Sequence, residues 1–508
     1  MNLSVYTLKN ITSDKVTVPD EGIFELPEKV LQFGTGILLR GLPDYFIDKA
    51  NRMGIFNGRI VVVKTTNRGD VSAFDKQDGL YTLCVRGITE GKKVEENIIN
   101  SSISRVLNAN SEWEQILECA HNQNLQVIIS NTTEVGIKLV NDDIRRHPPV
   151  SYPGKLLAFL HERFTAFEGS NKSGLVIIPT ELIPDNGKKL ESIVLELAHL
   201  NSMDDDFIEW IEQCNYFCNS LVDRIVTGMP DADVKKDIEN ELGYTDQLLT
   251  ICEVYRLWAI EGDDQIKKIL SFRDADEGIA IQSDIELYRE LKLRLLNGTH
   301  TLCCGLAFLA GFDMVNQAMN DNRFLQFITS LMQQEIGPSI PYKTKPVEVR
   351  AFIAKVLDRF RNPHINHHWK SIAFNYTSKM NLRCIPLLLN FYEKNQKPPE
   401  LFALGFASYI AFMKAIKQTG DDFFGEFNGV SYRIEDEMAE RFYKMWQVLP
   451  ADKVVNEVLK NEAFWGKDLT LLRGFERSVT EKLHSIINKG MMTTLASIHA
   501  NKIFIDES

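Results

Sequence analysis

Three residues in one apolar stretch of the sequence carry side chains suited to proton transfer at a carbonyl group. Lys292, Asn297 and His300 lie in the segment Lys-Leu-Arg-Leu-Leu-Asn-Gly-Thr-His. A desolvated lysine can exchange protons near neutral pH because its pKa is lowered. An asparagine amide can hold the oxygen of a carbonyl or a developing alkoxide, and a histidine can orient that oxygen. Together these residue types supply what reversible carbonyl reduction requires.

The spacing of these three residues decides whether they can meet. In an α-helix, Asn297 lies about 140° and His300 about 80° around the helix axis from Lys292. We therefore expect the three side chains to converge on one site. The alternative is a solvated amphipathic helix whose lysine and histidine face water.

A glycine turn near the start of the chain is a second feature with chemical meaning. Gly34 and Gly36 follow a predicted short strand, Lys29–Gln32, and precede a predicted helix. Two such glycines let the backbone turn sharply and approach a pyrophosphate, whose charge then meets the helix N-terminus. The third glycine of a G-x-G-x-x-G pattern would fall at Leu39, so a plain tight turn is the alternative.

Two later strand ends bear on the choice of cofactor. NAD enzymes often place an acid after the second strand for the ribose hydroxyls, whereas a basic residue accepts a 2′-phosphate. This chain has Lys64 and Arg68 there and no acid, which leaves NAD and NADP both open. Asn131 and Thr132 follow another predicted strand and are candidates to flank the nicotinamide ribose, with ordinary turn chemistry as the alternative.

The elements that must position these residues change character along the chain. In the first half, near-continuous apolar strands alternate with helical segments, which indicates a parallel sheet covered on both faces. The predicted strands are Arg59–Val63, Gln126–Ser130 and Gly174–Ile178, and the predicted helices include Trp113–Ala120 and Pro153–Phe167.

After about residue 280, helical spacing prevails and strand signals are few. The predicted helical segments are Ile285–Ala310, Asn322–Glu335, Pro346–Arg359 and Phe402–Lys417, and the predicted loops are Lys394–Glu400 and Thr419–Val430. The sequence thus predicts an α/β N-terminal Rossmann-type domain with a parallel sheet, residues 1–278, that binds a dinucleotide. A mostly α-helical C-terminal domain, residues 279–508, would carry the substrate and catalytic residues.

The composition narrows the functional classes. The chain has 508 residues and a formal net charge of −12, which disfavours nonspecific nucleic-acid binding. It has no run of about 18 apolar residues and no hydrophobic signal core, so we expect a cytoplasmic protein that binds no membrane. His364, His367 and His368 fit no common zinc spacing, and we expect a polar helix start there and no metal.

Three motifs occur in the order and spacing of the mannitol dehydrogenase family, the long-chain, zinc-independent polyol dehydrogenases. They are Gly34-x-Gly36-x3-Arg40, Val222-Asp-Arg-Ile-Val226 and Lys292-x4-Asn297-x2-His300. The resemblance spans about Leu31 to Gly490. Within the family, the chain is most similar to members that act on hexuronic acids, through segments such as Leu31–Gly34, Gln77–Tyr81, Ser130–Gly136, Pro179–Leu182, Leu221–Gly228 and Leu296–Thr301.

This resemblance implies a function and a set of roles. It implies a Rossmann-type domain and a helical domain with substrate held between them, Lys292 as general acid/base, and Asn297 and His300 on the reacting oxygen. It implies NAD as the cofactor. The residues it places at the cofactor are Phe33, Gly34, Gly36, Ile37, Arg40, Lys64, Asn131 and Thr132.

The expected reaction is the reduction of a keto-hexuronate, tagaturonate to altronate, by NADH. The alternatives are the sister reduction of fructuronate to mannonate, a mannitol-type polyol dehydrogenase and, from another class, a non-catalytic nucleotide-binding sensor. The intact Lys–Asn–His set argues against the sensor. The sequence predicts a small sugar-acid partner and leaves the oligomeric state open.

Several positions depart from the polyol pattern and concern the substrate. Where mannitol-type enzymes carry an Asp-Asn pair, this chain has Glu181 and Leu182. Arg289 replaces a glutamate three residues before the lysine of the motif. A guanidinium there would favour an anionic sugar acid over a neutral polyol, and a solvent-facing cation is the alternative.

Three further residues are assigned to the substrate from the resemblance. Lys379 matches a family lysine associated with substrate, although Ser371 stands where its usual arginine companion would be. Asp223 and Arg224 lie in the Val-Asp-Arg-Ile-Val motif. They either contact the substrate or brace the structure around it.

Overall fold

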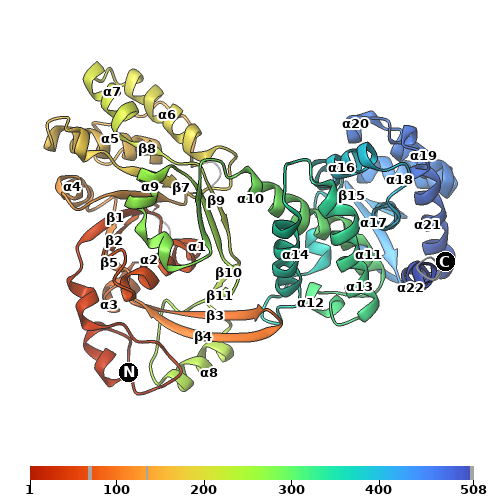
Figure 1. The fold of residues 1–508 in the computed structure, drawn as a ribbon, viewed down its shortest axis with the longest axis horizontal. Coiled ribbons are helices and arrows are strands. Elements are labelled where there is room, and N and C mark those ends of the chain that lie inside the picture. Colours follow the sequence, from red (N-terminus) through yellow and green to blue (C-terminus); the bar gives the residue numbers. More distant parts are fainter. Residues whose placement is uncertain (67–70, 133–135, 504–508) are drawn as a thin grey trace. The chain divides into compact units, whose positions relative to one another are not determined.

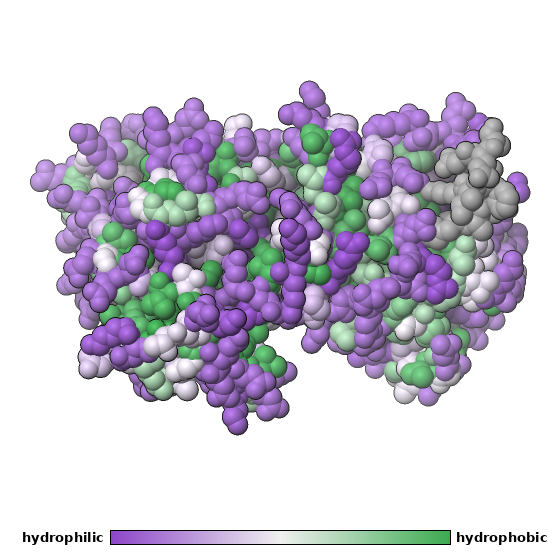
Figure 2. All heavy atoms as spheres, turned by 60° about the horizontal axis from the view of Figure 1, so that its bottom comes forward, coloured by the Kyte–Doolittle hydropathy of each residue, from purple (hydrophilic) through white to green (hydrophobic). Residues whose placement is uncertain are grey.

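The chain forms two compact units in a computed structural model that describes residues 1–66, 71–132 and 136–503, with side chains as far as residue 497. The first unit comprises Met1–Gly87 and Lys93–Ile285, and the second comprises Ile88–Lys92 and Glu286–Ser508 (Figure 1). Hydrophilic side chains cover most of the face in Figure 2, with apolar ones in scattered patches. Within the described chain, no helix has the length and apolar character needed to span a membrane.

A six-stranded parallel sheet organises the first unit, in the order β5-β2-β1-β6-β7-β8. Its strands are β1 (Glu28–Phe33), β2 (Arg59–Lys64), β5 (Ile103–Asn108), β6 (Val127–Ser130), β7 (Val176–Pro179) and β8 (Tyr216–Phe217). Renumbered along the chain, the order is 3-2-1-4-5-6, that of a doubly wound dinucleotide-binding sheet. The predicted Rossmann-type parallel sheet is confirmed.

Side chains that alternate along the strands bury both faces of this sheet. Leu31 and Phe33 belong to one core with helices α4, α5, α6 and α7, whereas Val30 belongs to a second core with α2. The helices on these faces are α2 (Pro43–Arg52), α4 (Trp113–Glu118), α5 (Tyr152–Ala166), α6 (Asn186–Leu200) and α7 (Asp205–Cys214). Burial on both sides explains why these strands read as continuous apolar runs.

Two smaller sheets complete the first unit, in the orders β10-β11-β3-β4 and β13-β12-β9. Their strands are β3 (Tyr81–Thr89), β4 (Lys92–Asn100), β9 (Ser220–Asp223), β10 (Val226–Gly228), β11 (Thr250–Glu253), β12 (Leu257–Glu261) and β13 (Ile279–Gln282). The remaining helices are α1 (Ile37–Gly41), α3 (Ser72–Lys76), α8 (Ala232–Leu242) and α9 (Asp264–Ile269). These smaller sheets were not among the predicted elements.

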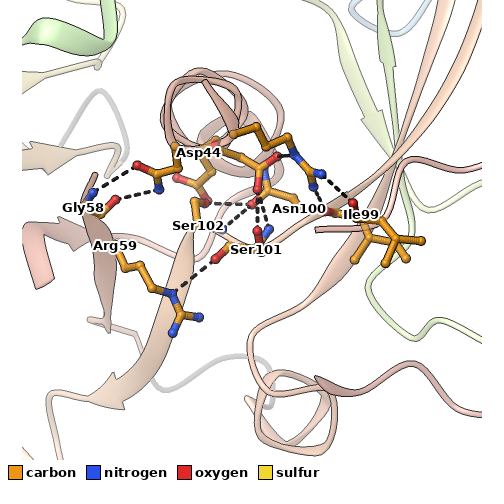
Figure 3. A network of polar contacts seen from close by, with 11 residues as sticks. Asp44, Gly58, Arg59, Ile99, Asn100, Ser101 and Ser102 are labelled. Atoms are coloured by element: carbon orange, nitrogen blue, oxygen red, sulfur yellow. Dashed lines mark hydrogen bonds and ion pairs between the residues drawn. The ribbon is translucent and has the colours of Figure 1, made fainter. Parts of the chain in front are cut away.

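A polar network binds helix α2 to the residues that precede β5 (Figure 3). Asp48 accepts hydrogen bonds from the backbone N and the Oγ of Ser101, both at 2.8 Å, and from Arg52 Nε at 2.7 Å. The Asn100 amide donates to the backbone oxygen of Asp44 at 3.0 Å. The network ties α2 to the segment that enters β5.

The second unit is mostly helical, as predicted. Its α-helices are α10 (Glu286–Leu291), α11 (Thr299–Leu309), α12 (Val315–Ala318), α13 (Asn322–Ser330), α14 (Pro346–Phe360), α15 (Trp369–Ile372), α16 (Tyr376–Lys394), α17 (Glu400–Phe412), α18 (Ala439–Val448), α19 (Ala451–Leu459), α20 (Glu462–Trp465), α21 (Phe475–Lys489) and α22 (Met491–Ile503). One extended apolar core joins them. Helix α11 packs against α15, α16 and α17, which places the predicted motif at the centre of this unit.

The predicted loop Thr419–Val430 is wrong. Strands β14 (Lys417–Thr419), β15 (Asp422–Phe427) and β16 (Val430–Ile434) form an antiparallel sheet there, and the preceding helix ends at Phe412 instead of Lys417. Asn428 and Gly429, with φ of 52° and 77°, form the two-residue turn between β15 and β16. An Asn-Gly pair between alternating apolar residues is a hairpin signal that the loop assignment overlooked.

Candidate active site

The segment that holds Lys292 and Asn297 is a π-helical turn, Lys292–Gly298, inserted between α10 and α11. The expected angles around the axis assumed an α-helix and are wrong for this segment. Hydrogen bonds in a π-helix span five residues, so Lys292 and Asn297, five apart, lie one π turn apart. Single π turns inside helices occur frequently at functional sites.

Arg294 forms a buried ion pair with Glu290 and also holds this turn against α16. Arg294 Nε and Nη2 donate to the two carboxylate oxygens of Glu290 at 3.0 and 3.2 Å, and both side chains are almost fully buried. Arg294 Nη1 also donates to the backbone oxygens of Leu382 and Arg383, at 2.8 and 2.9 Å. The Arg294 guanidinium therefore donates four hydrogen bonds. Lys292, which is half-buried, lies between Glu290 and Arg294 in the sequence.

His300, near the start of α11, is enclosed by aromatic rings. Its ring stacks on Phe360 at 4.3 Å between centroids and lies edge-on to His367 at 5.0 Å and Trp369 at 5.9 Å. The Nε2 atom is buried and has no hydrogen-bond partner among the described residues. Burial holds the pKa of His300 well below its usual range, and the neighbouring His367 and arginine charges lower it further. The imidazole is therefore neutral, with one nitrogen left to bind a ligand.

Arg383 contacts Thr301, which follows His300 in the sequence and also bonds to Asn297. The Thr301 hydroxyl donates to the backbone oxygen of Asn297 at 2.8 Å and accepts a hydrogen bond from Arg383 Nη1 at 3.2 Å. Lys379, one turn earlier on α16, donates from Nζ to the backbone oxygen of Ile372 at 3.0 Å. Burial lowers the pKa of Lys379, and the charge of Arg383 lowers it further.

Some residues near the motif were not identified as site residues by the sequence. His367 was considered only as a potential metal ligand, and Arg359 and Arg383 lie in the middle or at the end of long amphipathic helices. Their charges act on His300 in the folded chain. No local pattern marks them, because packing between helices brings them together. Arg289, by contrast, pairs with Glu286 on its own helix at 2.5 Å.

The glycine turn lies at the carboxyl edge of the main sheet. Gly34 has φ of +128°, and a Cβ there would lie 2.9 Å from the backbone oxygen of Asn131, so the position requires glycine. The backbone N of Asn131 donates to the Phe33 oxygen at 3.1 Å, which joins the ends of β1 and β6. Ligands of doubly wound sheets bind at this point, where the strand order reverses. A Cβ on Gly36 would meet no atom closer than 4.0 Å.

The other predicted cofactor residues surround this turn with different roles. Arg40 Nη1 donates to the backbone oxygen of Leu248 at 2.7 Å. Lys64 is buried and donates to the backbone oxygen of Thr66 at 2.6 Å. Phe33 packs on a tyrosine ring, and Ile37 is partly exposed at the start of α1. Both cations are thus bound to the protein backbone. Arg68 lies outside the described residues.

The loops after β6 and β7 are held together by Glu181. Its carboxylate is buried and accepts hydrogen bonds from the backbone N and Oγ1 of Thr132, at 2.8 and 3.0 Å, and from Ser130 Oγ at 3.2 Å. The Asn131 amide donates to Thr180 Oγ1 at 3.0 Å. Glu181, which departs from the polyol pattern, therefore braces the strand ends next to the turn, and the neighbouring Leu182 is exposed.

Arg224 is placed as a brace within the first unit. Its Nε donates to the backbone oxygen of Glu253 at 2.9 Å and its Nη1 to that of Gly41 at 2.6 Å, while the guanidinium lies over the Tyr45 ring at 4.6 Å. These contacts tie the end of β9 to β11 and α1. Asp223 beside it is buried as well.

The histidines His364, His367 and His368 lie between α14 and α15. Among the residues that the structure describes, no group of three or more histidine, cysteine, aspartate or glutamate side chains is placed to hold an ion. His368 pairs instead with Asp313 at 3.0 Å, directly before α15, and His367 lies against His300.

Comparison with known proteins identifies the family. Residues 28–271 match the mannitol dehydrogenase Rossmann domain, and residues 284–487 match the mannitol dehydrogenase C-terminal domain. Altronate oxidoreductase from Bacillus subtilis is 38% identical over 474 residues, which cover 93% of this chain and 95% of that protein. Altronate oxidoreductase from Halalkalibacterium halodurans is 36% identical over 484 residues, covering 93% and 94%. The chain belongs to the mannitol dehydrogenase family.

Solved structures of the mannitol dehydrogenase family have the same fold. Mannitol 2-dehydrogenase from Pseudomonas fluorescens, solved with NAD and D-mannitol, aligns with a TM-score of 0.66 at 21% identity, over 98% of this chain and 100% of that one. A D-sorbitol dehydrogenase in substrate-free form aligns with a TM-score of 0.76 at 19% identity, over 97% and 100%. The resemblance inferred from the three motifs is thus confirmed.

Proposed function

We propose that this protein is an NAD-dependent oxidoreductase that acts on a CH–OH group and interconverts D-tagaturonate and D-altronate. The observation that carries the proposal is the 36–38% identity to altronate oxidoreductases over more than nine tenths of the chain. Residues 1–278 hold the dinucleotide in this proposal, and residues 279–508 hold the substrate and the catalytic residues.

The glycine turn fits the pyrophosphate of a dinucleotide. Gly34 lets the backbone pass within van der Waals contact of Asn131, and the open space at Gly36 leaves room for a ligand against the bare backbone. The segment Phe33–Ile37 holds the cofactor there, with Asn131 and Thr132 next to it. When bound, NADH supplies the hydride that reduces the carbonyl carbon. Arg40 and Lys64, which bond to the backbone oxygens of Leu248 and Thr66, lie near the cofactor in this proposal.

The π-helical turn supplies the proton chemistry in this proposal. Lys292 gives a proton from Nζ to the carbonyl oxygen during reduction and takes it back during oxidation. The Asn297 amide and the neutral His300, in its Nε2–H tautomer, donate hydrogen bonds to the same oxygen. The unpaired, buried Nε2 of His300 supports this assignment.

A reducing compartment suits the cysteines of this chain. All eight are unpaired, and seven of them are buried. Because unpaired thiols persist where glutathione keeps them reduced, we propose a cytoplasmic location. The proposed partner is a small sugar acid.

An NADH-oxidation assay with several keto-sugars tests the function. We expect the highest kcat/KM with tagaturonate, a lower value with fructuronate and the lowest with the neutral ketose fructose, and we expect NADH to be preferred over NADPH. A higher value with fructuronate would assign the sister reaction. NADH binding without turnover of any substrate would indicate the sensor.

Activity should survive exhaustive chelation, and loss with EDTA that zinc restores would contradict the Lys–Asn–His mechanism.

A further inference from the structure

Two cations on α16 lie beside the proposed active site without a carboxylate partner. Arg383 and Lys379 are four residues apart, so they share one face of the helix. Arg383 Nη1 contacts the Thr301 hydroxyl, and Lys379 Nζ contacts the backbone oxygen of Ile372. Across the part of the chain that the structure describes, neither side chain forms an ion pair. Both are partly buried.

The surroundings of these cations do not neutralise them. The acid whose charge acts on Lys379 is Asp436, and its carboxylate accepts hydrogen bonds from the backbone N and Oγ1 of Thr377, at 2.7 and 2.9 Å, and from the Met438 N at 2.8 Å. His367, next to His300, is neutral or positively charged and so supplies no negative charge; burial and neighbouring cations lower its pKa. The cluster therefore carries excess positive charge.

Two other arginines of the same unit differ in this respect. Arg294 pairs with Glu290 through two hydrogen bonds, and Arg289 pairs with Glu286 at 2.5 Å. Partly withdrawing a charge from water without a partner is unfavourable, and an anionic ligand would remove that cost. Arg383 and Lys379 are therefore suited to bind an anion close to Asn297 and His300.

We propose that Arg383, assisted by Lys379, binds the carboxylate of the substrate and determines the preference for a sugar acid over a neutral sugar. This inference rests on the proposed function and names the residue that selects its substrate class. The planar guanidinium matches the two carboxylate oxygens, and Lys379 adds a second charge on the same helix face. Arg383 thereby takes the role that the sequence alone assigned to Arg289, whose charge Glu286 already balances.

The test compares substrates with and without the carboxylate. We would measure kcat/KM for tagaturonate and for fructose with the wild type and with Arg383→Met, Arg383→Lys, Lys379→Met and Arg289→Met. Arg350→Met, which changes an exposed arginine on α14, is the matched control. For Arg383→Met we expect the tagaturonate-to-fructose ratio to fall by about 100-fold, since truncating one side of a buried charge pair has effects of that order. Arg383→Lys should restore part of the ratio, and Lys379→Met should lower it to a smaller extent.

The possible outcomes separate the two proposals. A wild type that reduces no keto-uronate would overturn the function itself. A wild type that is active, with an unchanged ratio in Arg383→Met and Lys379→Met, would overturn the assignment of Arg383. A ratio that falls in Arg289→Met instead would place the carboxylate at Arg289. If Arg383→Met does not fold, the ratios of Arg383→Lys and Lys379→Met decide. Arg383→Lys keeps the positive charge, and Lys379→Met changes a side chain that is partly exposed, so both variants should fold.

Discussion

The protonation state of the His300 imidazole is determined by the residues around it. Burial and the charges of His367, Arg359 and Arg383 keep the imidazole neutral, so it can hold an oxygen and cannot serve as a second cation. In the proposed mechanism this leaves the proton transfer to Lys292. In that mechanism the neutral imidazole donates a hydrogen bond to the reacting carbonyl oxygen, and the lysine exchanges the proton.

Replacing the lysine tests this division directly. We expect Lys292→Ala to lower kcat for tagaturonate reduction by about 10²- to 10⁴-fold, the usual contribution of a positioned acid/base. NADH should still bind, because the glycine turn belongs to the other unit. Steady-state kinetics at saturating substrate and NADH fluorescence titration measure the two quantities. Near-normal turnover would remove Lys292 from proton transfer.

The sequence could propose Lys292, Asn297 and His300 as site residues because their chemical types stand at fixed short spacings. It could not identify Arg383, because that residue reaches Thr301 only after α16 packs on α11. Arg40 was assigned to the cofactor from its place in a motif, and that assignment stays a prediction. Its guanidinium donates to the backbone oxygen of Leu248, a contact that no local pattern indicates.

At the level of elements, the alternation of strands and helices was readable, whereas departures from regular structure were not. Strands such as Arg59–Val63 are buried on both faces of the sheet, so their apolar residues follow one another without a break, and this pattern can be recognised from one sequence alone. The π turn Lys292–Gly298 has the same leucine-rich composition as an α-helix, so nothing local distinguishes it. The sheet β14–β16 was missed for another reason, since its Asn428-Gly429 turn was present and went unused.

The turn between β1 and α1 offers a matched pair of glycine variants. We expect Gly34→Ala to lower the free energy of unfolding by about 1–3 kcal/mol, because alanine is strained at φ of +128° and would press on the Asn131 oxygen. Gly36→Ala should leave stability within about 0.5 kcal/mol, since its Cβ meets open space. It should nevertheless weaken NADH binding at least about tenfold, because the methyl group occupies the approach of the pyrophosphate.

Denaturant unfolding and NADH titration on both variants separate structural from binding roles. The informative case is Gly36→Ala, whose fold is expected to stay intact. Unchanged NADH affinity in that variant would remove this turn from the cofactor site.

For the molecule as a whole, one buried carboxyl group makes stability depend on pH. Asp44 on α2 (Figure 3) is fully buried. Burial raises the pKa of Asp44 to about 8. In the unfolded chain an aspartate has a pKa of about 3.9. The folded protein therefore holds a proton over a pH range in which the unfolded chain has released it.

The sign of the effect follows from this difference. The contribution of Asp44 to stability is complete below about pH 4 and is lost as the pH rises toward 8, by up to about 1.4 kcal/mol per pH unit. Asp44→Asn keeps a neutral side chain of the same shape at every pH, so we expect its free energy of unfolding to decline less than that of the wild type between pH 6 and 8.5. Urea unfolding at several pH values measures the slope. Asp20→Asn, which changes an exposed aspartate, should keep the wild-type slope. Equal slopes in Asp44→Asn and the wild type would show that Asp44 is ionised in the folded protein, and its burial would then need a compensating cation such as Arg40.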